Sequence, residues 1–387
     1  MHVLFVEPAF PRNQREFVRA LHGAGARVTA IGESPLEALP DELRHALYQY
    51  EQVSSVVDEP SLQAAVERAQ EDEAVDRLEA TVEAHILPVA RVREARGIPG
   101  TSVRTAFLCR DKPAMKEALR QAGVACAEST GADSLEEARA FVERVGYPVI
   151  VKPRDAAGAA GTWLVRDDAG LVAAARESAL DHGASVAVEE FVEGHEGFFD
   201  TITIGGEIAH HFVSHYYPNV LEAMRTRWIS PQIVATNRLS AEGYEEVHAL
   251  GQKVITALGI NTSATHMEWF FGPKGLKFSE IGCRPPGVGA WDLYCMAHEM
   301  DVYREWAMAI VHERTSQERS CDYAAGLINL RPEGDGTITG YEGLEILDEL
   351  DDAVMDHRLP PPGTPNSGPN LSYMLRRCGI FRSLCWL

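Results

Sequence analysis

Short apolar runs alternate with segments of helical spacing over the first hundred residues. A strand is expected at Val3–Val6 and another at Arg27–Ile31, and apolar residues with helical spacing predict a helix over residues 14–24 between them. A strand–helix–strand unit within about thirty residues predicts a parallel sheet. The Gly- and Pro-containing segment at 97–102 interrupts both kinds of regular structure and is expected to end this first unit.

The rest of the chain mixes helices with strands whose pattern fits antiparallel pairing. Helices are expected at 64–71, 86–96, 112–121, 135–145, 241–258 and 292–313. Strands are expected at 149–152, 186–191, 199–204, 207–213, 265–271, 276–281, 324–330 and 336–346. The sequence therefore predicts a mixed α/β and α+β protein with a Rossmann-like first unit and a small β-rich C-terminal segment.

Composition narrows the class of protein. The 387 residues are 45% hydrophobic and carry a net charge of −21, which disfavours a nucleic-acid partner because phosphate backbones are bound by clustered Lys and Arg. No apolar stretch is long enough to span a membrane, and the N-terminus lacks a signal-peptide pattern. The seven cysteines are scattered without a CxxC pair, so reduced thiols in a cytoplasmic protein are expected.

Two lysines and a small-residue loop form the first candidate for chemistry. Lys112 opens a predicted helix, and Lys152 closes a predicted strand that is followed by the Gly/Ala-rich loop 155–161. Lysine charges and closely approaching backbone N–H groups suit a triphosphate. The alternative is a pair of surface lysines beside an ordinary loop, and the loop is not a Walker A sequence.

A second candidate is the extended segment at 186–196, with the sequence VAVEEFVEGHE. A strand of this kind can lie beside a purine, whose hydrogen-bonding edge its backbone would match while Phe191 and Val192 supply apolar walls. Glu196 could accept hydrogen bonds from both ribose hydroxyls. The alternative is a solvated acidic strand end.

The strongest candidate lies between residues 266 and 287, where two apolar strands are joined by the turn GPKG. Antiparallel pairing would bring Glu268 and Glu280 together among Met, Trp and Phe side chains. Two such carboxylates are costly to bury unless a cation compensates them, and oxygen ligands beside a nucleotide favour Mg²⁺. Arg284 follows and could hold a carboxylate or a transferring phosphoryl group. The alternative is a buried Glu–Arg ion pair without a metal.

The order of these features resembles the ATP-grasp superfamily, most closely its biotin-carboxylase-like and amino-acid-ligase-like branches, over about residues 110 to 290. The resemblance implies a pre-ATP-grasp domain at 1–105, two ATP-grasp subdomains at 106–185 and 186–318, and a C-terminal segment at 319–387. It implies ATP and Mg²⁺ as cofactors, with Mn²⁺ as an alternative metal. The residues to which it assigns phosphate, adenine or ribose contacts are Lys112, Lys152, Gly158, Ala159, Ala160, Gly161, Glu189, Glu190, Phe191, Val192 and Glu196. Glu268 and Glu280 would bind the metal, and Arg284, with Lys152, would act in catalysis.

One residue departs from the family pattern, because Gly282 stands where an asparagine is usual. The absence of that oxygen ligand implies bidentate binding by Glu280, a water in its place, or weak catalysis. The resemblance implies an ADP-forming ligase that joins a small-molecule carboxylate, activated as an acyl-phosphate, to an amine. Amino acids are the expected substrates, and a homodimer is a candidate assembly. A bicarbonate-activating carboxylase-like enzyme and a catalytically weak nucleotide-binding protein are the alternatives.

Overall fold

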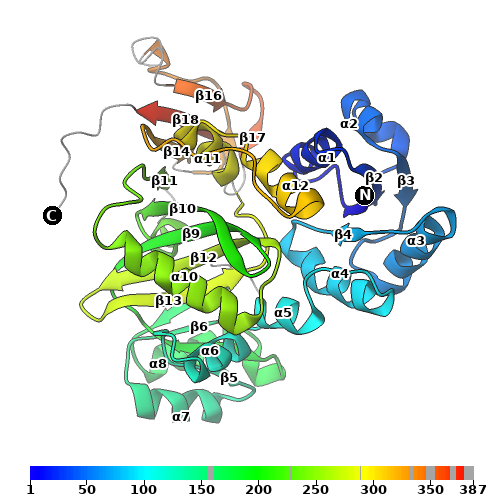
Figure 1. The fold of residues 1–387 in the computed structure, drawn as a ribbon. Helices are drawn as coiled ribbons and strands as arrows, with labels where there is room; N and C mark the ends of the chain where they lie inside the picture. Colours follow the sequence, from blue (N-terminus) through cyan, green and yellow to red (C-terminus); the bar gives the residue numbers. More distant parts are fainter. Residues whose placement is uncertain are drawn as a thin grey trace.

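The structure is a computed structural model that describes residues 1–154, 161–226, 229–287, 289–331, 334–345, 354–366 and 372–378. Its strands form sheets of four, eight, two and four strands. Figure 1 shows the N-terminal unit on one side, the large sheet in the centre with the smaller four-stranded sheet below it, and the C-terminal strands above. This mixed arrangement confirms the predicted fold class. Among the described residues, no helix has the length and apolar composition needed to cross a bilayer.

The N-terminal sheet is entirely parallel, with strand order β3-β2-β1-β4. Its strands are β1 (His2–Val6), β2 (Arg27–Gly32), β3 (Gln49–Gln52) and β4 (Arg77–Glu79). The helices that accompany them are α1 (Gln14–Gly23), η1 (Leu36–Ala38), α2 (Asp41–Ala46), α3 (Glu59–Asp72) and α4 (Glu83–Ala95). The buried apolar strand β1 lies in the middle, so the predicted parallel sheet is confirmed.

The smaller four-stranded sheet is separate from the N-terminal sheet. It has the order β5-β8-β6-β7 and is antiparallel. Its strands are β5 (Ser129–Ala132), β6 (Val149–Pro153), β7 (Trp163–Val165) and β8 (Val186–Glu190). Its helices are α7 (Leu135–Val145), α8 (Asp168–Glu177) and η2 (Leu180–His182), while α5 (Val103–Leu108) and α6 (Lys112–Gln121) connect it to the N-terminal unit. The predicted helix at 135–145 is confirmed, with the Ser134 hydroxyl accepting a hydrogen bond from the Glu137 N–H as its N-cap.

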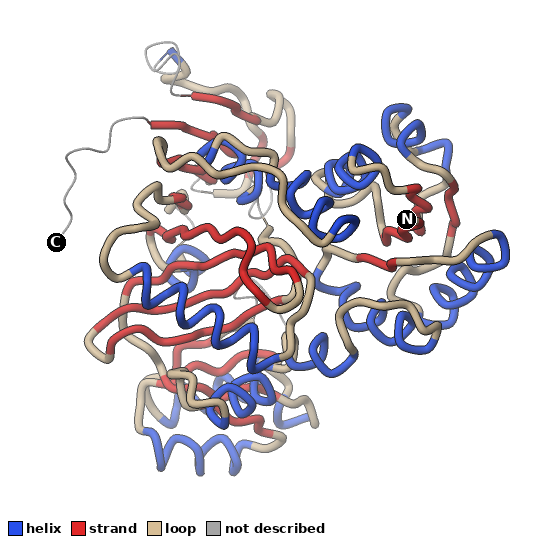
Figure 2. Tube along the Cα trace, in the orientation of Figure 1, coloured by secondary structure: helices blue, strands red, loops and turns tan. Residues whose placement is uncertain are grey.

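The large sheet has the order β13-β12-β9-β10-β11-β14-β18-β16. Its strands are β9 (His195–Ile204), β10 (Glu207–Tyr217), β11 (Gln232–Ala235), β12 (Ser263–Gly272), β13 (Gly275–Gly282), β14 (Ala324–Leu330), β16 (Val354–Arg358) and β18 (Ser372–Cys378). Helix α10 (Tyr244–Leu258) crosses one face of this sheet, as Figure 2 shows, and buries Val254, Ile255 and Leu258. Helix α9 (Val220–Arg225) follows β10, and the short strands β15 (Gly336–Thr337) and β17 (Pro365–Asn366) pair separately.

Two of the predicted elements were wrong. The single helix expected at 292–313 is divided into α11 (Ala290–His298) and α12 (Val302–His312). Glu299 has a left-handed backbone with φ of 52°, and the Asp301 side chain accepts a hydrogen bond from the Arg304 N–H to begin the second helix. The strand expected at 336–346 is limited to β15, and its last residue lies outside the described residues.

The domain limits remain proposals. The limits proposed after residues 185 and 318 fall in connecting segments, and the one proposed after residue 105 falls within α5.

Candidate active site

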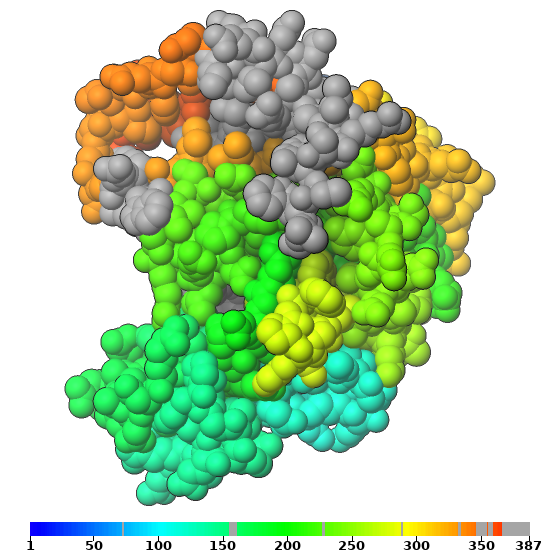
Figure 3. Space-filling view, turned by 90° about the vertical axis from the view of Figure 1, so that its left-hand side faces the viewer, coloured from blue at the N-terminus to red at the C-terminus, as the bar shows by residue number. Residues whose placement is uncertain are grey.

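A cavity between the smaller four-stranded sheet and the large sheet gathers most of the predicted site residues. Figure 3 shows the face on which residues 110–190 lie below the green and yellow surface of later residues, with an indentation between them. The predicted residues that line the cavity are Lys112, Lys152, Glu189, Glu190, Phe191, Val192, Glu196, Glu268 and Glu280. Arg284 does not line it. Gly158, Ala159 and Ala160 lie outside the described residues, and Gly161 follows them with φ of +63°.

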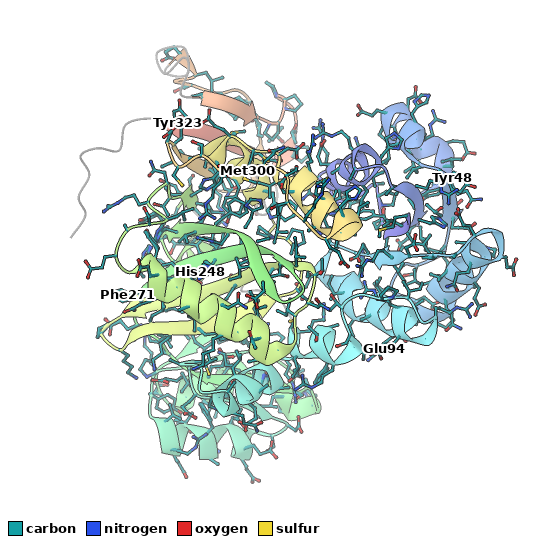
Figure 4. All side chains as sticks on the ribbon, in the orientation of Figure 1. Tyr48, Glu94, His248, Phe271, Met300 and Tyr323 are labelled. Carbon is teal, nitrogen blue, oxygen red and sulfur yellow. The ribbon has the colours of Figure 1, made fainter. Side chains whose placement is uncertain are left out.

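The hairpin of β12 and β13 carries the two carboxylates predicted to bind metal. Glu268 and Glu280 are directly opposite each other in the antiparallel register, and the register shifts immediately after Glu268. An irregularity of this kind bends a strand and can redirect its side chains. Figure 4 labels Phe271 at the outer end of this hairpin, where the ring is exposed, so the two glutamates lie toward its inner part.

The lysine side of the cavity consists of Lys112, Lys116 and Lys152 with the carboxylate of Glu189. Asp111 caps α6 by accepting a hydrogen bond from the Ala114 N–H, which places Lys112 at the first helical position. Lys112 Nζ lies 3.5 Å from Glu280 Oε2. Both Lys116 Nζ and Lys152 Nζ lie 2.8 Å from Glu189 Oε2.

The charge of Glu189 is compensated by the two ammonium groups beside it. Burial alone would raise the pKa of Glu189, but the ammonium groups of Lys116 and Lys152 lower it to about 2. Burial alone would lower the pKa of Lys152, but Glu189 and Glu280 raise it. The carboxylate and Lys152 are therefore both charged near neutral pH.

The acidic side of the cavity consists of Glu196 and Glu268. Burial, and then the charge of Glu268, raise the pKa of Glu196 to about 8. The Glu196 side chain accepts a hydrogen bond from the Val220 N–H at 2.6 Å, which links it to the start of α9. Glu268 has the imidazole of His266 as a neighbour.

His266 and Asp200 lie behind the acidic side. The Nδ1 atom of His266 is 2.7 Å from Asp200 Oδ1, and its Nε2 atom is 3.7 Å from Glu268 Oε1. Although burial alone would lower the pKa of His266, Asp200 raises it to about 9. The two ring nitrogens of His266 thus face two different carboxylates.

Arg284 lies in an adjoining cavity that shares Lys112 and Glu280 with the first one. Its Nε atom donates a hydrogen bond to Glu83 Oε2 at 2.6 Å, so a carboxylate from the start of α4 already occupies the guanidinium. Burial alone would lower the pKa of Arg284, but Glu83 raises it.

The same pair lies close to Gly282. A Cβ atom there would lie 3.2 Å from Glu83 Oε2 and 3.4 Å from Arg284 Cγ. A larger residue at position 282 would therefore require these two side chains to shift by a few tenths of an ångström.

The position of the predicted adenine segment is consistent with an apolar slot. Phe191 and Val192 follow β8 and line the cavity, and the Glu190 side chain pairs with Lys274. Other apolar residues lining the cavity are Ala127, Ile150, Val220, Leu221, Phe270 and Phe278.

Sequence reasoning missed two charged residues of this region. Lys116 lies four residues after Lys112 in a helix that was predicted, so helical spacing could have identified it. Glu83 is 201 residues from Arg284 along the chain, and no local pattern connects them.

The carboxylates fit a hard divalent cation. No group of three or more His, Cys, Asp or Glu side chains converges on one metal position within the described ranges. Glu268 and Glu280 would therefore share Mg²⁺ with phosphate oxygens and water, which is how this ion is usually held beside nucleotides.

Comparisons with known proteins agree with this geometry. Residues 117–299 match the family described as the ATP-grasp domain. Alanine–anticapsin ligase from Bacillus subtilis strain 168 is 28% identical over 218 residues, which cover 50% of this chain and 44% of that protein. The L-arginine-specific L-amino acid ligase from Bacillus subtilis is 28% identical over 222 residues, covering 55% and 52%. The chain thus spans about half the length of these curated relatives.

A solved structure extends the likeness in fold to nearly the whole chain. The crystal structure of an L-amino acid ligase from Bacillus licheniformis superposes with a TM-score of 0.78 at 17% identity, covering 98% of this chain and 94% of that one. The biotin carboxylase domain of a 2-oxoglutarate carboxylase from Hydrogenobacter thermophilus, in complex with MgADP and bicarbonate, superposes with a TM-score of 0.69 at 16% identity, covering 98% and 86%.

Proposed function

Because residues 117–299 match the ATP-grasp domain family, we propose that this chain is an ATP-dependent ligase that joins a carboxylate to an amine through an acyl-phosphate. The observation that carries the proposal is the direct pairing of Glu268 and Glu280 in a cavity that Lys112 and Lys152 also line. Two carboxylates and two lysines at one place can bind a nucleotide's phosphates together with a divalent cation.

Lys152 and Lys112 would bind the phosphates of ATP, and the apolar slot beside Phe191 and Val192 would hold adenine. Glu196 would accept hydrogen bonds from the ribose hydroxyls. Mg²⁺, or Mn²⁺, held by Glu268 and Glu280 would offset the charge of the transferring phosphoryl group. The loop 155–161 would cover the phosphates.

Arg284 would bind the acid substrate. Its guanidinium already accommodates a carboxylate, that of Glu83, in a cavity adjoining the first across Glu280 and Lys112. A substrate carboxylate that replaced Glu83 there would lie next to the residues assigned to the transferring phosphate. Its oxygen would attack the γ-phosphorus with loss of ADP, and an amine would then displace phosphate to leave an amide.

The relatives named above act on alanine, anticapsin or L-arginine according to their names, so amino acids are the substrates we propose. The protein would act in solution in the cytoplasm, alone or as a homodimer.

Release of ADP from MgATP in the presence of amino-acid pairs tests the proposal. We expect release that requires both an acid and an amine, with an amide of the matching mass as product. Release that requires only bicarbonate would instead identify a carboxylase-like enzyme. Tight ATP binding without turnover on any substrate would identify a nucleotide-binding protein.

A further inference from the structure

Lys116 is the most deeply buried cation of the cavity, and neither the nucleotide phosphates nor the metal require it. Its side chain is 1% exposed, and its Nζ lies 2.8 Å from Glu189 Oε2. It lines the nucleotide cavity from α6, one helical turn after Lys112. A lysine is rarely buried to this degree unless it is paired, and Glu189 is the partner of Lys116. The question is what this buried pair does in the nucleotide cavity.

Lys152 shares the same oxygen of Glu189, at the same distance of 2.8 Å. The proposed function assigns Lys152 to the phosphates of ATP, and an ammonium drawn toward a triphosphate compensates Glu189 less. A buried carboxylate with no remaining cation is costly and takes up a proton. Lys116 can remain with Glu189 throughout, so Glu189 can stay ionised while Lys152 turns to the phosphates.

The ionisation of Glu189 would affect which base its other oxygen, Oε1, can bind. Oε1 is buried and accepts no hydrogen bond from the described part of the chain. An ionised carboxylate can only accept hydrogen bonds, whereas a protonated one can also donate. The 6-amino group of adenine donates and the 6-oxo group of hypoxanthine accepts, so the charge on Glu189 would distinguish the two bases.

We propose that Lys116 is a positioning residue that keeps Glu189 ionised, with Oε1 directed at the exocyclic group of the base, and thereby sets the preference for adenine over 6-oxopurine nucleotides. This inference rests on the proposed binding of ATP in the same cavity. It concerns base selection, which the phosphate and metal contacts do not determine. Lys152 would instead contribute affinity for the triphosphate whatever the base.

The test is calorimetric binding of ATP and ITP, each with Mg²⁺, to the full chain and its variants. We expect the wild type to bind ATP at least about tenfold more tightly than ITP, as a site built to accept a hydrogen bond disfavours an acceptor. Lys116→Met should reduce this ratio to about threefold or less, and Lys116→Arg should retain it. The matched control Lys152→Met should weaken both nucleotides while leaving their ratio unchanged.

A double-mutant cycle keeps the test valid if Lys116→Met folds poorly. Lys116→Met/Glu189→Leu removes both charges of the pair and should fold better than the single lysine variant. Its ATP/ITP ratio should equal that of Glu189→Leu, because Lys116 acts only through Glu189. A wild-type ratio in Lys116→Met, an equal loss of ratio in Lys152→Met, or no base preference in the wild type would overturn the inference. Failure of the wild type to bind either nucleotide would overturn the proposed function itself.

Discussion

The two sides of the nucleotide cavity differ in how their charges are compensated before any ligand binds. On the lysine side, Glu189 is held between Lys116 and Lys152, and its pKa is lowered to about 2. On the acidic side, burial and the charge of Glu268 raise the pKa of Glu196 to about 8. Glu280 lies between them, within 3.9 Å of Lys152 and opposite Glu268 in the hairpin.

This difference indicates which kind of ligand each side of the cavity would bind. A compensated set of charges holds its side chains in place without ligand and can exchange one carboxylate partner for a phosphate. On the acidic side, a cation that binds at Glu268 would instead favour ionisation of Glu196. Substitutions on the two sides should therefore have opposite signatures, in catalysis, stability and proton binding.

The largest expected effect is on turnover. Glu280→Gln removes a carboxylate charge at the junction of the two sides, and kcat should fall about a thousandfold because charge on the transferring phosphoryl group is no longer offset. ADP release under saturating substrates measures it, with unfolding by urea to establish that the fold is retained. Glu246→Gln, at an exposed position on α10, is the matched control and should leave kcat unchanged. Undiminished turnover in Glu280→Gln would contradict the metal assignment.

Stability in the absence of ligand should separate the two sides most directly. Glu189→Gln leaves buried Lys116 without its carboxylate and Lys152 with Glu280 alone, and should lower the free energy of unfolding by about 3 kcal/mol. Glu196→Gln replaces a carboxyl that is ionised at pH 7 in the unfolded chain but held protonated for the most part in the folded protein, so it should leave that free energy unchanged or raise it. Urea unfolding in EDTA at pH 7 measures both. Equal losses in the two variants would mean that the cavity is not divided in this way.

More of the fold than of the candidate site could be predicted from the sequence. The period of apolar residues identified β1, α1, α6 and the hairpin of β12 and β13, because each buries one face against a neighbour. The division between α11 and α12 was missed because helical apolar spacing continues across Glu299. No sequence motif predicts the left-handed backbone of that residue.

At the site, local spacing was sufficient for Glu268 and Glu280, since a tight turn fixes which residues are opposite each other. The contact of Glu83 with Arg284 depends on how the N-terminal unit packs against the large sheet, which no short motif encodes. Lys116 was missed for a different reason. Its helical position was predicted, but its burial depends on a partner, Glu189, in a separate strand.

The pH dependence of stability gives a smaller and more specific effect. The pKa of Glu196 in the folded protein is raised to about 8 from an ordinary value of 4.5. A raised carboxyl pKa contributes stability that is fully present below pH 4.5 and is lost as pH rises through 8. The stability of the wild type relative to Glu196→Gln should therefore decline between about pH 4.5 and pH 8 in EDTA and change little at higher pH. The pKa of Glu189, lowered to about 2, gives the opposite sign, with stability lost only below about pH 4.5. A parallel pH profile for wild type and Glu196→Gln would contradict the raised pKa.

The smallest effect, and the one that joins the two sides, is proton release on binding MgADP. At pH 7 a carboxyl with a pKa of about 8 holds its proton in most molecules. Positive charge brought to Glu268 and Glu280 would favour ionised Glu196, so a proton should leave when the metal nucleotide binds. Calorimetry in buffers of different ionisation enthalpy measures the number released, which we expect to be just under one in the wild type and close to zero in Glu196→Gln. Glu189→Gln should release as much as the wild type, because its side chain belongs to the side that is already compensated. Equal release from wild type and Glu196→Gln would show that the acidic side is charged before the metal arrives, and the contrast between the two sides would then be one of geometry alone.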